Sequence, residues 1–243
     1  VLARLWARDQ SRWLAQPDGQ ADGYLAASES DEYKTGMHDS ETDLIERNLE
    51  RIVTKLDHDV RALNLGCGEA LKTIQVLVEA QKRGKNVVFY PVDISKKILD
   101  IAIRNAERAG LETHGLQEDF EQLGQLLSKT KPARQTFVYL GANFVNFDSD
   151  SILSLIRDHM KEGDLIYFSA QISERDSHEI ITQYNTPKIG DFLFQTVKPL
   201  GLSSEDISYS ARFNLNTREV EMYFTIRNLP EKLKKSKLMT GDE

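Results

Sequence analysis

The sequence predicts an α/β fold, in which a parallel β-sheet is covered by helices on both faces. Three observations support this prediction. Between residues 60 and 170, short apolar runs alternate with amphipathic patterns of helical period. The connections between them are short. Glycines and acidic residues follow several of the apolar runs directly, at the place where open parallel sheets bind ligands.

Each element is predicted from its own pattern of apolar residues. A first helix is expected at residues 39–56, where apolar side chains recur at helical spacing. The expected strands are residues 60–65, 86–92, 112–116, 135–140 and 164–170. The helices expected between them are residues 70–82, 96–109, 120–128 and 150–161, and Gly110 and Gly163 end two of these helices.

After residue 170 the alternation of strand and helix stops. Residues 179–197 are predicted to be helical with a break at Pro187 and Gly190, and residues 207–215 and 219–226 to form an antiparallel hairpin. The expected parts are an N-terminal helical segment at 1–58 that belongs to a substrate-side lobe, a ligand-binding core at 59–170, and a region at 171–243 that completes the lobe or the sheet.

Composition indicates a chain without a nucleic-acid or membrane partner. The net charge of the 243 residues is -7, which disfavours a nucleic-acid surface. No apolar run approaches the ~18 residues of a membrane span. Cys67 is the single cysteine, which fits a reducing compartment, so a cytoplasmic protein is expected. The five histidines lack metal-ligand spacing, so no metal site is expected.

The stretch LGCGEALKT at residues 65–73 is similar to three kinds of ligand-binding loop. A phosphate-binding P-loop needs glycine immediately before Lys-Thr, where this chain has Leu71. A dinucleotide loop needs a third glycine, and Leu71 again stands in its place. The loop of class I S-adenosylmethionine (SAM) methyltransferases needs only Gly66 and Gly68, so that the backbone can approach the methionine part of the ligand.

Two acidic residues after later strands favour the SAM loop. Asp93 ends the second strand, where a carboxylate can accept hydrogen bonds from both ribose hydroxyls. Asp119 follows the third strand, within reach of an adenine amine. The alternative is that each of these carboxylates only caps the helix that follows it. Cys67 is interpreted as a small residue in a tight loop, with a reactive thiol at a helix N-terminus as the alternative.

The motifs together resemble the SAM-dependent histidine-specific methyltransferase family, typified by the Nα-methyltransferase of ergothioneine biosynthesis. The resemblance rests on LGCGEALKT at 65–73, YPVDIS at 90–95, EDFE at 118–121 and LGANFVNF at 140–147. It implies a Rossmann-like class I SAM methyltransferase with an added substrate-side lobe. The activity implied is N-methylation of the α-amino group of an amino acid, with histidine as one possibility.

The resemblance also implies roles for individual residues. The residues expected to bind SAM are Gly66 and Gly68 beneath the methionine moiety, Lys72 at its carboxylate, Asp93 at the ribose, Asp119 and Phe120 at the adenine, and Gly141 below the sulfonium. The residues expected to bind the amino-acid substrate are Asn146 and Tyr184 near its backbone groups, and Tyr33 and Met222 near its side chain. No catalytic base is assigned.

Two alternatives stay open. In the family an E-x-S motif that grips the imidazole follows a turn like TGDE, and this chain ends with TGDE at residues 240–243. Either the chain is truncated or it lacks the pair that recognises histidine. A different class of function is a SAM-binding module without amino-acid methyltransferase activity.

Overall fold

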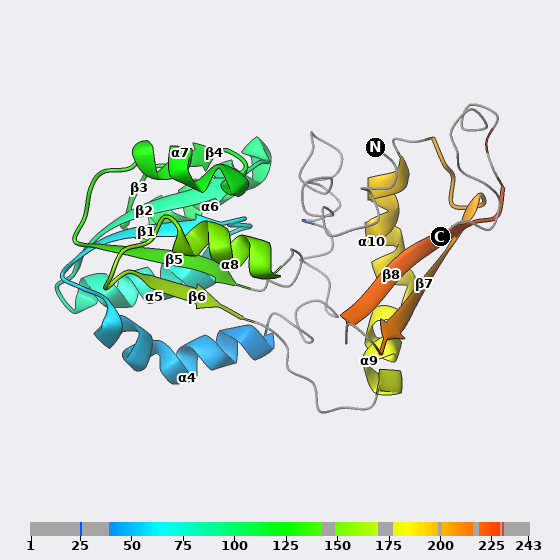
Figure 1. Cartoon of the computed structure of the whole chain (residues 1–243), viewed down its shortest axis with the longest axis horizontal. Coiled ribbons are helices and arrows are strands. Elements are labelled where there is room, and N and C mark those ends of the chain that lie inside the picture. The colour runs from blue at the N-terminus through cyan, green and yellow to red at the C-terminus, as the bar shows by residue number, and fades with distance from the viewer. Residues whose placement is uncertain are drawn as a thin grey trace. The chain divides into compact units, whose positions relative to one another are not determined.

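A computed structural model describes residues 25, 39–141, 149–169, 177–198, 201–215, 219–228 and 230 (Figure 1). These residues fall into two compact units. The sheet unit contains residues 39–141 and 149–169, and the hairpin unit contains residue 25 and the described residues from 177 onward. No helix within the described ranges is long and apolar enough to cross a membrane.

The sheet unit confirms the predicted parallel sheet. Its strands are β1 (Asp59–Leu65), β2 (Asn86–Asp93), β3 (Glu112–Thr113), β4 (Leu116–Gln117), β5 (Gln135–Gly141) and β6 (Leu165–Phe168). All pair in parallel in the order β3-β2-β1-β5-β6, and β4 also pairs with β2. The chain therefore moves to one side of β1 and later crosses to β5 on the other. The carboxyl ends of β1 and β5 form the switch point at which such sheets bind ligands.

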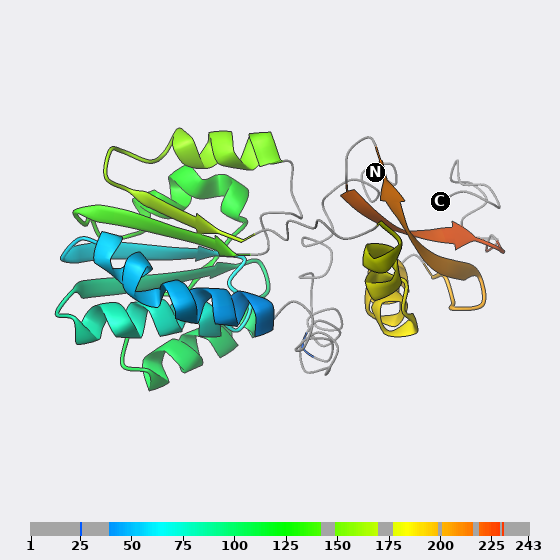
Figure 2. The ribbon, with the colours of Figure 1, turned by 90° about the horizontal axis from the view of Figure 1, so that it is seen from below.

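Helices cover both faces of this sheet (Figures 1 and 2). They are α4 (Asp39–Lys55), α5 (Leu71–Lys82), α6 (Lys96–Arg108), η3 (Phe120–Gln122), α7 (Leu123–Ser128) and α8 (Ser149–Arg157). One core joins α4, α5 and α6 to strand residues such as Ala62 and Phe137, and the other joins α7 and α8 to residues such as Leu63 and Val138. Because neighbouring strand residues face opposite sides, a strand buried on both faces needs a continuous apolar run.

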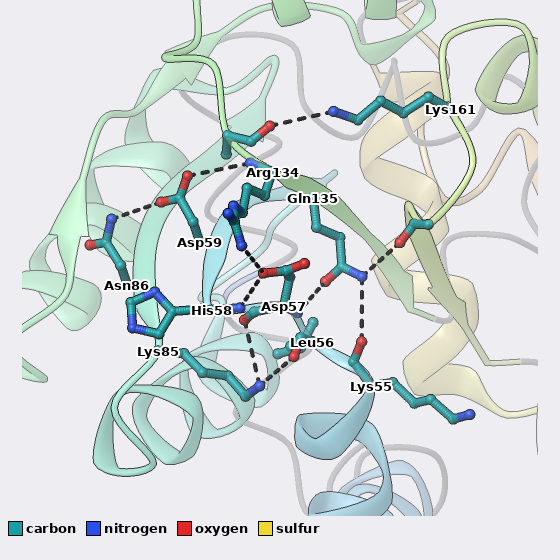
Figure 3. Close-up of polar contacts among 12 residues, drawn as sticks. Lys55, Leu56, Asp57, His58, Asp59, Lys85, Asn86, Arg134, Gln135 and Lys161 are labelled. Carbon is teal, nitrogen blue, oxygen red and sulfur yellow. Dashed lines mark hydrogen bonds and ion pairs between the residues drawn. The ribbon is translucent and has the colours of Figure 1, made fainter.

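A polar network around Gln135 holds the amino ends of the strands (Figure 3). The Gln135 amide donates to the carbonyl of Gly163 at 2.6 Å and to that of Lys55 at 3.4 Å. Its Oε1 accepts from the backbone N–H of Asp57 at 2.9 Å. One buried amide thus satisfies the end of α4, the approach to β1 and the turn before β6, at the edge of the sheet opposite the glycine loop.

Three predicted elements of the sheet unit differ in the structure. The helix predicted at 120–128 is divided into the 3-10 turn η3 and the helix α7. The third strand is divided into β3 and β4, because only two residues of each pair with β2. The helix predicted to reach residue 161 ends at Arg157. The N–H groups of His159 and Met160 make turn hydrogen bonds, to the carbonyls of Ile156 and Arg157. The Asp164 carboxylate accepts from the backbone N–H of Lys161 at 2.9 Å and from that of Thr136 at 2.6 Å, so Lys161 binds Asp164 in place of a helical carbonyl.

The hairpin unit contains α9 (Ser177–Tyr184), α10 (Pro187–Val197), β7 (Ile207–Asn214) and β8 (Glu219–Ile226). The two strands pair antiparallel, as predicted. The predicted break in the helix falls before Pro187, where Thr186 caps α10. The prediction was wrong for Gly190, which lies inside α10. A Cβ there would stand 3.0 Å from the ring of Tyr209, so the glycine serves close packing on β7.

Candidate functional site

The loop after β1 brings backbone N–H groups to the carboxyl end of the sheet. Gly66 and Gly68 have φ angles of 65° and 54°, a left-handed conformation that glycine adopts without steric cost. The N–H of Cys67, between them, donates to the carbonyl of Val92 in β2 at 2.9 Å. Ala70 is left-handed too, with φ 60°, and precedes α5 without a side-chain cap. These three left-handed residues therefore make a tight turn that leads directly into α5.

Asp93 lies at the end of β2 beside this loop. Its side chain is 8% exposed and accepts from the N–H of Ser95 at 2.9 Å and from that of Gly68 at 3.4 Å. Burial raises its pKa from 3.8 to about 6, and the hydrogen bonds from the backbone of Ser95 and Gly68 offset only part of that effect. The hydroxyl of Ser95 caps α6 by accepting from the N–H of Ile98, so Asp93 is not the helix cap considered from the sequence.

Cys67 contributes a buried thiol next to the same carboxylate. Its Sγ lies 3.9 Å from Oδ2 of Asp93. Burial, and then the negative charge of Asp93, raise the pKa of the thiol well above its usual range. A thiol that stays protonated is a poor nucleophile. The geometry therefore supports the interpretation of Cys67 as a small loop residue.

Asp119 follows β4, the short strand Leu116–Gln117 that pairs with the end of β2. The N–H of Glu118 donates to the carbonyl of Asp93 at 3.2 Å, which brings the segment after β4 beside the end of β2. The Asp119 carboxylate caps η3 by accepting from the N–H of Glu121 at 3.0 Å. The capping alternative is thus present in the structure, and the contact with adenine stays a prediction. Phe120 begins η3, and its side chain lies outside the described set.

Lys72, in the first turn of α5, forms an ion pair with Glu41 of α4. The Glu41 side chain is only 9% exposed, and that of Lys72 is 20% exposed. Glu41 also accepts from the hydroxyl of Ser169 at 2.6 Å and from that of Tyr139 at 3.2 Å. One carboxylate therefore joins α4, α5, β5 and the residue after β6 at the carboxyl edge of the sheet.

Gly141 ends β5 with a φ of 55°. A Cβ at this position would lie 3.0 Å from the ring of Tyr139 and 3.3 Å from Oε1 of Glu41. The glycine is thus required by both its conformation and its close neighbours. Burial and the Glu41 carboxylate raise the pKa of Tyr139 above its usual range, so its hydroxyl stays a hydrogen-bond donor.

Thr73 has a different role from its neighbour Lys72. Its hydroxyl accepts from the side-chain amide of Asn64 in β1 at 2.8 Å, and both side chains are buried. This contact fixes α5 to the strand that precedes the glycine loop. The two residues of the Lys-Thr pair, which suggested a nucleotide loop, therefore have different partners. Lys72 pairs with Glu41, and Thr73 binds Asn64.

Of the four residues predicted for the amino-acid substrate, the structure describes Tyr184 and Met222. Tyr184 ends α9, and its carbonyl accepts from the hydroxyl of Tyr209 at 2.8 Å. Met222 lies in β8, in register with Ala211 of β7. Both belong to the hairpin unit. Tyr33 and Asn146 lie outside the described residues.

Glu41 is the site residue that the sequence prediction missed. A signal for it exists, because Glu41 precedes Ile45 by one helical turn and so lies on the buried face of α4. A carboxylate on an apolar helix face needs a partner, although the pattern of α4 does not say which residue that partner is. Across the described parts of the chain, no group of three or more His, Cys, Asp or Glu side chains is arranged to hold a metal ion.

Comparison with known proteins gives one family and several distant relatives. A family model described as histidine-specific methyltransferase, SAM-dependent, matches residues 24–236. Ergothioneine biosynthesis protein 1 of Schizosaccharomyces pombe is 29% identical over 131 residues, which cover 50% of this chain and 17% of that protein. N-methyltransferase imqF of Aspergillus flavus is 24% identical over 169 residues, covering 66% of this chain and 45% of that protein. The chain thus spans less than half the length of either relative.

Solved structures of methyltransferases match this chain at low identity. The plantazolicin methyltransferase BpumL, crystallised with a monoazolic desmethylPZN analog and SAH, has a TM-score of 0.46 and 14% identity, covering 83% of this chain and 77% of that one. An O-methyltransferase from Bacillus cereus in complex with SAH has a TM-score of 0.42 and 13% identity, covering 91% of this chain and 97% of that one.

Proposed function

Because the chain belongs to the histidine-specific, SAM-dependent methyltransferase family, we propose that it N-methylates the α-amino group of an amino acid, with histidine as the first candidate. The family match confirms the methyltransferase class and the SAM cofactor predicted from the sequence. The acceptor is our proposal. It is supported by the family's description and by the partial likeness to ergothioneine biosynthesis protein 1.

The observation that supports SAM binding in this proposal is the buried carboxylate of Asp93, which accepts a hydrogen bond from the glycine loop. A carboxylate that is 8% exposed, with a pKa raised to about 6, gains from hydrogen bonds that replace lost water. The two hydroxyls of a ribose supply such bonds. Gly66, Gly68 and Gly141 have left-handed backbones, and a Cβ at Gly141 would crowd its neighbours. Residues at the ends of β1, β2 and β5 therefore fit SAM.

In the proposed site each residue binds or orients SAM or the substrate, and no residue is assigned as a catalytic base. SAM supplies a methyl group that its sulfonium already activates. Asp93 would accept from the ribose and Lys72 would donate to the methionine carboxylate. Burial raises the pKa of Tyr184, so its phenol stays protonated and suits a hydrogen bond that orients the substrate. Positioning of the amine is the main contribution expected from the protein.

The proposal is tested by incubating the chain with SAM and a panel of amino acids, followed by mass spectrometry. We expect a mass increase of one or more methyl groups on at least one amino acid. N-acetylhistidine, whose α-amino group is blocked, is the matched control and should stay unmodified. SAM binding without any methylated product would favour a SAM-binding module, and methylation of N-acetylhistidine would contradict the α-amino site.

A further inference from the structure

We propose that Glu41 is a positioning and specificity residue, which adapts the loop at residues 65–73 to the zwitterionic amino-acid end of SAM and disfavours a phosphate. This inference rests on the proposed function and adds to it a residue outside the predicted site. Lys72 and Thr73 follow a glycine loop, an arrangement that also suits a nucleotide phosphate. The carboxylate of Glu41 beside Lys72 changes the charge that this loop presents.

The first step is the placement of Glu41 between two predicted SAM contacts. Its Oε2 pairs with the ammonium of Lys72, which is expected to bind the SAM carboxylate. Its Oε1 lies 3.3 Å from the position of a Cβ on Gly141, which is expected to lie below the sulfonium. The amino-acid end of SAM carries an ammonium as well as a carboxylate, and the sulfonium is close to both. Glu41 thus lies beside both the residue expected at the SAM carboxylate and the residue expected below the sulfonium.

The second step is that Glu41 leaves Lys72 able to bind. A lysine ammonium has three donors, and the pair with Glu41 uses one side of it. Glu41 also accepts from Tyr139 and Ser169, which hold the carboxylate in one orientation. The flexible stem of Lys72 is thereby held in place before a ligand arrives, which reduces the entropy lost on binding.

The third step is the charge of the pair. Together Lys72 and Glu41 are neutral, so they complement a zwitterion and offer little attraction to a phosphate that carries two negative charges. Leaving out Glu41 would present an uncompensated lysine next to the first turn of α5, which attracts anions. Recognition of SAM is therefore combined with repulsion of the competing ligand class.

Packing alone would favour a different residue at this position. Glu41 lies on the same face of α4 as Ile45 and Val53, which are completely buried. An apolar side chain of similar volume often stabilises such a position as well as a buried ion pair does. A carboxylate that joins Lys72, Tyr139 and Ser169 is thus better explained by its effect on Lys72 than by stability.

The test measures by calorimetry the binding of three probes to the chain and to Glu41→Gln. The probes are SAM, 5′-methylthioadenosine, which lacks the amino-acid end, and ADP. We expect Glu41→Gln to bind SAM about tenfold more weakly, 5′-methylthioadenosine unchanged and ADP about tenfold more tightly. Equal weakening of SAM and 5′-methylthioadenosine would show a merely structural role and overturn the inference, as would an unchanged preference for SAM over both other probes.

The matched control removes the other contacts of Glu41 and keeps its charge. In the double variant Tyr139→Phe/Ser169→Ala the preference for SAM over 5′-methylthioadenosine should stay within about threefold of the wild type. A loss as large as that of Glu41→Gln would overturn the assignment of the effect to charge.

A second variant covers the case in which Glu41→Gln does not fold because Lys72 is left partly buried and unpaired. Because Lys72 itself is expected to contact SAM, Glu41→Gln/Lys72→Gln is compared with Lys72→Gln, and the double variant should show a smaller preference for SAM over 5′-methylthioadenosine. An equal preference in these two variants would overturn the inference. Absence of SAM binding to the wild-type chain would overturn the proposed function itself, which distinguishes the two failures.

Discussion

The backbone N–H of Gly68 donates to the carboxylate of Asp93 at 3.4 Å, which joins the loop after β1 to the end of β2. The contact is long, and Asp93 keeps a pKa raised to about 6 by burial. A well-satisfied carboxylate would show the opposite shift. The backbone donors that hold Asp93, including the N–H of Ser95 at 2.9 Å, therefore offset only part of the effect of its burial.

Binding of SAM should depend on pH through Asp93. The ionised carboxylate accepts from both ribose hydroxyls much more strongly than the protonated acid does, and its pKa of about 6 leaves about a tenth of it ionised at pH 5. We expect SAM to bind about tenfold more weakly at pH 5 than at pH 7.5, measured by calorimetry. Asp93→Asn should bind weakly with no slope over this range. Equal affinity of the wild type at both pH values would contradict the prediction.

The stability of the ligand-free protein should change in the opposite sense. Because the pKa of Asp93 is raised from 3.8 to about 6, the folded state holds its proton more tightly than the unfolded state between these values. Stability is therefore lost as pH rises through about 6. From pH 7.5 to pH 5, the free energy of unfolding of the wild type should rise by about 1.4 kcal/mol relative to Asp93→Asn.

Urea unfolding of both proteins at pH 5, 6 and 7.5 measures this difference. The variant serves as the reference because the other titrating groups are the same in both chains. A difference between the two proteins that does not vary with pH would show that Asp93 has an ordinary pKa in the folded state.

The order of elements in the sheet unit follows from apolar periodicity alone. Residues 86–92 and 135–140 were predicted as strands because strands buried on both faces need long apolar runs, and β2 and β5 match them. The end of α8 was not predictable in this way. The Asp164 carboxylate that binds the N–H of Lys161 also binds the backbone of Thr136 in a distant strand, a contact that local sequence does not show. Gly190 was misjudged for a similar reason, because its neighbour Tyr209 comes from β7.

Site residues could be predicted from the sequence where their role follows from their position at the end of a strand. Asp93 and Gly66 stand directly after strands, so their positions follow from the predicted topology. The partner of Lys72 was not predictable from local sequence, because Glu41 is 31 residues away and meets it only through the packing of α4 against α5. Roles of Tyr184 and Met222 in binding the substrate stay predictions.

Gly141→Ala should destabilise the protein more than an ordinary left-handed glycine would. A left-handed alanine costs about 1–2 kcal/mol, and the new Cβ would lie 3.0 Å from the ring of Tyr139. We expect a total loss of roughly 2–3 kcal/mol in urea unfolding. Gly84→Ala is the matched control, because Gly84 has a φ of 78° and a Cβ there meets nothing within 4 Å. Equal losses in the two variants would exclude a contribution from the crowding at Gly141.

Thr73→Val should destabilise the chain through Asn64 and not through lost volume. The two side chains have similar shape, but valine cannot accept the hydrogen bond that Thr73 takes from the Asn64 amide at 2.8 Å. Asn64 is 3% exposed, so water cannot readily replace the lost acceptor. We expect a loss of about 1–3 kcal/mol in the free energy of unfolding, measured with urea.

A double variant separates this cause from a general disturbance of α5. Asn64→Leu/Thr73→Val replaces both partners of the hydrogen bond by apolar side chains, which removes the buried donor along with its acceptor. If the unsatisfied amide is the cause, the double variant should be more stable than Thr73→Val alone. If α5 instead needs the hydroxyl for another reason, the second substitution should add to the loss, and the contact with Asn64 would not explain why threonine follows Lys72.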